Sequence, residues 1–134
     1  MAETIGGKKT IINSPRQGDG PEVARIVKAC GLLFIMGHVS VDETRLNVVG
    51  KGDMKAQAER VFERIKIALE DAGATVDDMV QMTSYVKDYS RMNEVQEARK
   101  KYFPNGGVAG TGVEISALVN PEMLIEVQGI AVAP

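Results

Sequence analysis

Glu126 is the residue of this sequence whose surroundings most suggest chemistry. It lies in the otherwise apolar run MLIEVQGIAV, with Gln128 two residues further on. A carboxylate in such a run is costly unless it is paired, exposed or functional. Side chains two residues apart share one face of a strand. This face either meets water or a partner subunit, or it forms a site in which Glu126 holds a water or moves a proton.

The stretch Asn105–Ile115, NGGVAGTGVEI, has a glycine spacing that invites comparison with phosphate-binding loops. Such loops lead into a helix N-terminus, whose free N–H groups bind the anion. The residues after Gly112 alternate and are β-branched, which predicts a strand, and the Walker Lys-Ser/Thr pair is missing. We therefore expect the glycines to serve a turn and a close approach of the backbone.

His38 and Cys30 are the only histidine and the only cysteine in the chain. His38 follows Gly37 at the end of a predicted strand, where it has a structural role or acts as a general base. Cys30 is expected to be a small core residue rather than a nucleophile. One histidine and one cysteine do not supply the ligands of a zinc site, so we expect no metal.

Strands and helices must position these residues. Residues 1–9 are expected to be a loose start to the chain, before the first strand or helix. Strands are predicted at Thr10–Asn13, Val23–Ala29, Leu32–His38, Met79–Lys87, Val113–Leu118 and Met123–Val132. The second and third of these should form a hairpin that turns near Cys30, and Val39–Val49 is a candidate continuation of the sheet. The segment Ser14–Pro21, rich in turn-forming residues, should be a loop.

Two helices are predicted between these strands. Apolar residues recur at spacings of three and four from Ala58 to Ala72, after a possible N-cap at Asp53 and before a possible C-cap at Gly73. The charged residues of this helix, among them Arg64, should fall mainly on its solvated side. Ser90 is a candidate cap for a second helix, which Pro104 ends. In the strand between the two helices, Val80, Met82, Ser84 and Val86 should share one face.

This order of elements predicts an α+β fold in a single domain over residues 1–134, with the helices covering one face of a mixed sheet. Apolar strand residues on the other face predict a homo-oligomer. The chain has a net charge of −2 and few aromatic residues, which argues against nucleic acid as the main partner. It shows no signal core and no apolar run of about 20 residues, so we expect a cytoplasmic protein without a membrane partner.

From about Thr10 onward the sequence resembles the Rid family of YjgF/RidA-type enamine and imine deaminases. The matching stretches are GPEVARIVKACGLLFIMGHVSVD, MKAQAERVFERIKIALEDAGATVDDMVQMTSYVKD and LIEVQGIAV. The resemblance implies a chorismate-mutase-like fold, assembled as a homotrimer with sites between subunits. It also implies hydrolysis of reactive imines or enamines to a 2-keto acid and ammonia, with no metal or organic cofactor.

Two site residues follow the family pattern and several depart from it. The resemblance implies that Glu126 positions the water and that the backbone N–H of Gly37 helps to bind a small-molecule substrate. Met36 stands where the family has a serine, and Gln96 stands where it has an asparagine.

The larger departure is Gly110, which aligns with the arginine that clamps the substrate carboxylate in the family. Thr111 follows it as the next polar residue of the site. Without that arginine, the substrate lacks the carboxylate or carries it elsewhere, another cation such as Arg25 or Arg99 reaches in, or the activity has been lost.

We therefore expect a hydrolase of the deaminase type, acting on an activated imine or enamine other than the standard 2-iminobutanoate. The alternative is a non-catalytic member of the same fold that binds small molecules or other proteins.

Overall fold

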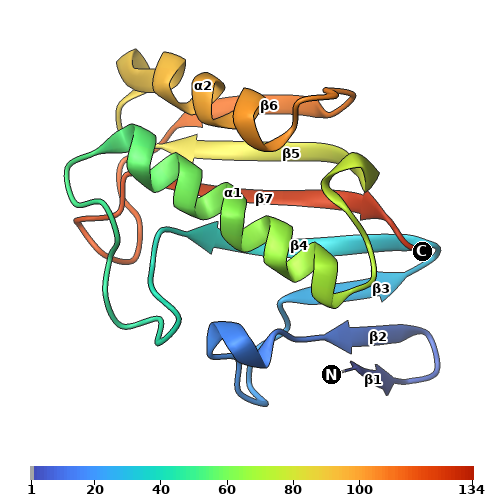
Figure 1. Cartoon of the computed structure of the whole chain (residues 1–134). Helices are drawn as coiled ribbons and strands as arrows, with labels where there is room; N and C mark the ends of the chain where they lie inside the picture. Colours follow the sequence, from blue (N-terminus) through green and yellow to red (C-terminus); the bar gives the residue numbers. More distant parts are fainter. Residues whose placement is uncertain (1) are drawn as a thin grey trace.

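The computed structural model describes residues 2–134, which form one seven-stranded sheet with two α-helices on one of its faces (Figure 1). The strands are β1 (Ala2–Ile5), β2 (Lys9–Ile12), β3 (Ile26–Ala29), β4 (Leu32–Val39), β5 (Met79–Val86), β6 (Ala109–Glu114) and β7 (Ile125–Val132), and the helices are α1 (Met54–Asp71) and α2 (Met92–Tyr102). The strand order is β1-β2-β3-β4-β7-β5-β6, with β5 and β6 parallel and the other neighbours antiparallel. The predicted α+β class, a mixed sheet with two helices on one face, is confirmed.

The first half of the sheet consists of two hairpins. The loose start expected over residues 1–9 is wrong for the described part, because β1 pairs with β2 through a turn at Gly6 and Gly7, both at positive φ. The hairpin of β3 and β4 is confirmed, and its turn contains Cys30 at φ 53° and Gly31 at φ 74°. Cys30 is therefore exposed in a tight turn rather than buried in the core as expected.

The segment after β4 does not continue the sheet as proposed for Val39–Val49. It forms a loop with one isolated bridge between Val41 and Val48. The Asp42 carboxylate accepts hydrogen bonds from the backbone and hydroxyl of Thr44 and from Asn47. These hydrogen bonds, those from Thr44 first, lower the pKa of Asp42 to about 2. The side chain of Asp42 thus replaces strand pairing with a compact local turn.

Helix α1 packs the apolar stripe found in the sequence onto the sheet. The Asp53 side chain accepts a hydrogen bond from the backbone N–H of Ala56, which confirms the cap, and Gly73 takes the left-handed conformation at φ 76°. Val61, Phe62, Ile65 and Leu69 are fully buried. The solvated position expected for Arg64 is wrong, because its side chain is also buried.

Smaller differences concern the second half of the chain. The cap before α2 is Asp88, whose side chain accepts from the Ser90 N–H at the start of a 3-10 turn, so Ser90 is not the cap. Val80 does not share the buried face of β5, because the pairing with β7 shifts register between Met79 and Gln81. Strand β6 begins at Ala109 rather than at the predicted Val113, so part of the glycine stretch is itself a strand.

The helices of residues 2–134 are too short or too polar to cross a bilayer.

Candidate functional site

Glu126 lies on the face of the sheet that the helices do not cover. Its neighbours in β7, Ile125 and Val127, are fully buried toward the helices, so the alternation of the strand turns Glu126 to the opposite side. A Cβ atom added to Gly37 on the adjacent β4 would overlap Oε2 of Glu126 and lie 2.8 Å from its Cδ. The carboxylate therefore rests directly on the backbone of Gly37, which a side chain at that position would prevent.

The backbone around Gly37 forms a bulge. The pairing of β4 with β7 shifts between Ile35 and His38, which leaves Met36 and Gly37 in the irregular segment. The N–H of Met36 donates to the carbonyl of Arg25 over 2.9 Å. A bulge of this kind redirects backbone groups out of the regular ladder, so it can present them to a bound molecule.

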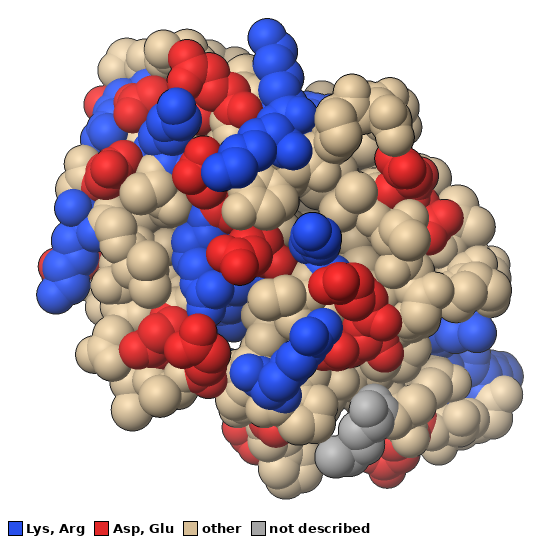
Figure 2. Space-filling view, viewed as in Figure 1, with Lys and Arg blue, Asp and Glu red and all other residues tan. Residues whose placement is uncertain are grey.

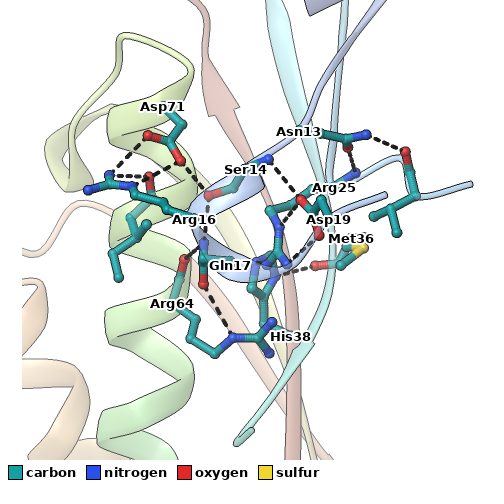
Figure 3. Close-up of polar contacts among 12 residues, drawn as sticks. Asn13, Ser14, Arg16, Gln17, Asp19, Arg25, Met36, His38, Arg64 and Asp71 are labelled. Carbon is teal, nitrogen blue, oxygen red and sulfur yellow. Dashed lines mark hydrogen bonds and ion pairs between the residues drawn. The ribbon is translucent and has the colours of Figure 1, made fainter. Parts of the chain in front are cut away.

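A series of buried, hydrogen-bonded side chains, from Asp19 through Arg25 to His38, supports the bulge (Figure 3). His38 Nδ1 donates to the Met36 carbonyl over 2.8 Å, and His38 Nε2 accepts from Nη1 of Arg25 over 2.8 Å. Arg25 in turn binds both carboxylate oxygens of Asp19, over 2.6 and 2.7 Å. Burial would raise the pKa of Asp19, but the hydrogen bonds from Arg25 and Ser14 bring it below its ordinary value.

His38 has a structural role and is not available as a general base. It has no exposed surface, and burial together with the Arg25 charge lowers its pKa to about 3. The imidazole is therefore neutral at physiological pH and fixes the Met36 carbonyl. Sequence reasoning missed Asp19 and Arg25 as supports of the site, although an arginine inside the apolar run Val23–Ala29 is a signal for a buried pair.

Burial also acts on Glu126, since it raises the pKa of this carboxyl above its ordinary value. The hydrogen bonds among residues 2–134 include none to its carboxylate, which keeps both oxygens available to water or to a ligand. A carboxylate with a raised pKa that lies against a backbone bulge is suited to accept a proton from a water.

The remaining predicted site residues gather elsewhere. Gln96, Gly110 and Thr111 line a cavity of about 200 Å³ between α2 and the strands β5 and β6. A Cβ added to Gly110 would overlap Nη1 of Arg99 and lie 3.1 Å from its Cζ. The Arg99 guanidinium, which also donates to the Val108 carbonyl over 2.7 Å, thus lies where a side chain of residue 110 would begin.

One chain does not bring these two groups together. Gly110 faces α2, because its neighbour in β5 is the buried Met82, whereas Glu126 faces the uncovered side of the sheet. Met36, Gly37 and Glu126 are close to one another, and Gln96, Gly110 and Thr111 form a separate cavity. The close approach expected for the glycine stretch is present, and the element approached is α2.

Comparison with known proteins gives consistent results over most of the chain. The model of the Endoribonuclease L-PSP family matches residues 21–133. A RutC family protein of Pyrococcus abyssi is 36% identical over 108 residues, which cover 81% of this chain and 84% of that protein.

Solved structures share the fold described above. A member of the YjgF/YER057c/UK114 family from Mycobacterium tuberculosis is 30% identical with a TM-score of 0.78, over 93% of this chain and 99% of that one. A protein of unknown function of the conserved Rid family from Yersinia pestis has a TM-score of 0.85 at 24% identity, with the same shares covered.

Replacing Gly37 with alanine should move the Glu126 carboxylate off the β4 backbone. The added methyl would occupy the position of the carboxylate, and the flexible glutamate side chain can turn toward solvent without unfolding the sheet. The pKa of Glu126, followed by NMR titration of its carboxyl carbon, should then fall toward the ordinary glutamate value. An unchanged raised pKa in Gly37→Ala would show that the contact does not hold the carboxylate.

The contact between Arg99 and Gly110 can be tested with a double-mutant cycle. Gly110→Ala should lower the free energy of unfolding by about 1 kcal/mol when Arg99 is present, because the guanidinium must move. In an Arg99→Ala background the same change should have almost no effect. Equal losses in both backgrounds, measured by denaturant unfolding, would mean that Arg99 does not lie over Gly110.

Proposed function

The chain belongs to the Endoribonuclease L-PSP (YjgF/Rid) family, and on this basis we propose that it is a hydrolase of reactive imines or enamines in which Glu126 activates the water. The observation that carries the proposal is the contact of the Glu126 carboxylate with the Gly37 bulge. This contact sets a proton acceptor beside a backbone that a substrate can reach. The partial burial that raises the pKa of Glu126 makes it a better base than an exposed glutamate.

The proposed reaction needs only a proton acceptor and a bound water. The water oxygen adds to the imine carbon while the Glu126 carboxylate accepts one of its protons. The nitrogen takes up that proton, which gives a carbinolamine. The Glu126 carboxylate then passes the hydroxyl proton of the carbinolamine to the nitrogen, the C–N bond breaks as the C=O bond forms, and ammonia leaves. The sum is imine plus water giving a ketone and ammonia, so Glu126 returns to its starting state.

We propose that Gln96, Gly110 and Thr111 reach the site of Glu126 from a neighbouring subunit. Gln96 and Gly110 lie on the far side of the sheet from Glu126 within one chain, so a second copy is needed to bring such a cavity to the carboxylate. The uncovered face supports an assembly, because Phe34, Val113 and Val132 are 43%, 36% and 46% exposed on the sheet. We propose the homotrimer that the family resemblance implies.

The family description also names ribonuclease activity, for which the net charge of −2 and the face drawn in Figure 2 offer no support. In the view of Figure 2 the basic and acidic side chains are interspersed over the visible surface rather than gathered into a basic patch. Exposed ion pairs such as Lys55 with Glu97 link the two helices. Because RNA binding requires a continuous basic surface, we do not propose RNA as the substrate.

The trimer predicts a particle about three times the 14.4 kDa of the chain in light scattering. Phe34→Asp should shift the distribution toward the monomer, because it puts a charge on the apolar face that the assembly would bury. A wild-type mass of one chain would contradict the trimer.

Glu126→Gln tests the catalytic role directly. With iminopyruvate generated in situ and trapped as the semicarbazone, wild-type protein should reduce semicarbazone formation. The variant should lose this effect by a factor of about 10² or more, the usual contribution of a general base. It should keep its thermal stability, since an amide costs less to bury than an ionised carboxylate.

Glu122→Gln is the matched control, because Glu122 is an exposed carboxylate of the same segment that pairs with Lys51. Equal activity of Glu126→Gln and wild type would remove the hydrolytic role of Glu126. Substrate analogues that bind without any turnover in the wild type would instead favour a non-catalytic binding protein.

A further inference from the structure

A second arginine-lined cavity lies beside the Gly37 bulge. Its volume is about 180 Å³, its polar lining is Arg45 and Arg64, and Val39, Val41 and Met123 contribute to its apolar lining. Gly37 belongs to its wall as well, and Val39 pairs directly with Glu126. Through Gly37 this Arg45–Arg64 cavity shares a wall residue with the contact of the proposed catalytic carboxylate in the same chain, unlike the cavity that holds Arg99.

Arg64 is a buried cation in this wall. It is 2% exposed and extends from α1, where Nε donates to Oε1 of Gln17 over 3.3 Å and Nη1 donates to the Val39 carbonyl over 2.6 Å. Both partners are neutral. The ion pairs within residues 2–134 include none to Arg64, and their hydrogen bonds include none from Nη2. A buried guanidinium without an acidic partner is a strong attractor for an anion.

Arg45 is held at the cavity in a conformation that arginine rarely adopts. Its φ is 66°, in the left-handed region, and the turn organised by Asp42 fixes the backbone there through the bond from the Arg45 N–H to the Asp42 carbonyl. Its Nη1 lies 3.7 Å from Oδ1 of Asp19, which already binds Arg25 with both oxygens. Local strain of this kind is common where a side chain must be presented to a ligand.

The charges around the cavity do not balance. The buried carboxylate of Asp19 pairs with Arg25 and Arg45, whereas the ion pairs among residues 2–134 include none to Arg64, and His38 is neutral. Arg60, the next cation along α1, pairs with its own acids Glu43 and Glu63 at the surface. Burial and the nearby charges of Arg25, Arg60 and Arg45 lower the pKa of Arg64 to about 10, in accordance with an excess of positive charge.

We propose that the Arg45–Arg64 cavity binds the carboxylate of a small organic acid and so presents the adjoining carbon of the substrate to Gly37 and Glu126. The inference rests on the proposed hydrolase for its purpose, but the binding itself is independent of turnover. Two guanidinium groups supply the charge-assisted hydrogen bonds that a carboxylate accepts. The apolar side chains of the wall suit a short hydrocarbon chain, and one water needs only about 10–15 Å³ of such space, so a molecule of several non-hydrogen atoms fits.

The inference is tested with 2-oxobutanoate, a small and stable 2-keto acid, titrated into the 134-residue protein and followed by amide NMR. The Gly37 and Arg45 amides should shift, and the neutral 2-oxobutanamide should bind at least tenfold more weakly. Arg45→Gly should weaken 2-oxobutanoate at least tenfold. Glycine adopts the left-handed conformation without strain, so this variant should stay folded.

Lys66→Ala is the matched control, because it removes one positive charge from an exposed position on α1 and should leave the affinity unchanged. Wild-type affinity in Arg45→Gly, or shifts centred on Arg99 and Gly110 instead of Gly37, would overturn the inference. Glu126→Gln separates the two proposals, since it should keep 2-oxobutanoate binding while losing turnover. If Glu126→Gln keeps turnover, the hydrolase mechanism fails, and the Arg45→Gly titration still decides the binding site.

Discussion

The candidate site around Gly37 and Glu126 depends on one constraint, the fully buried guanidinium of Arg25. A cation without solvent is stable only when its donors are satisfied, and removing one partner of such a pair is far more costly than losing a surface ion pair. Arg25 meets this requirement with Asp19 from the Ser14–Pro21 loop and with His38 from β4 (Figure 3). One side chain thus fixes the loop, the neutral state of the histidine and the carbonyl of the Met36 bulge.

The bulge links this network to the chemistry that we propose. A regular strand would turn every second side chain of β4 to the uncovered face, but the irregular segment puts Gly37 beneath Glu126. The same network influences the electrostatics on the other side of Gly37, because Asp19 is committed to Arg25 and neutralises Arg45 and Arg64 only in part. The proposed base and the proposed anion site therefore depend on the same network of Asp19, Arg25 and His38. The Glu126 carboxylate contacts Gly37 of the bulge, and the cavity with Arg45 and Arg64 includes Gly37 in its wall.

The alternation of the strands divides the candidate residues between two faces. Helices α1 and α2 cover the face of Val127 and Met82, and Gly110 approaches α2 on that side, whereas Glu126 and Phe34 look outward. A sheet with apolar residues on its uncovered face is stabilised when a second copy covers it. The chain therefore has a buried core between its helices and its sheet, while its candidate base, Glu126, lies on the face of the sheet that the helices leave uncovered.

The sequence by itself determined the elements that depend on local periodicity and local hydrogen bonds. Short-range geometry decides the helix predicted by the spacing from Ala58 to Leu69, its cap at Asp53, and the hairpin of β3 and β4. Glu126 could be singled out because a charged residue within an apolar run can be recognised from the sequence alone. Tertiary structure decided what depends on contacts between distant segments. It buried Arg64 against Gln17 and Val39, and it put Arg99 over Gly110. The exposed turn at Cys30 and the loop that Asp42 holds are local features that the pattern of apolar residues did not reveal. A side chain gains or loses water according to the elements packed against it, and residues far away in the chain supply those elements.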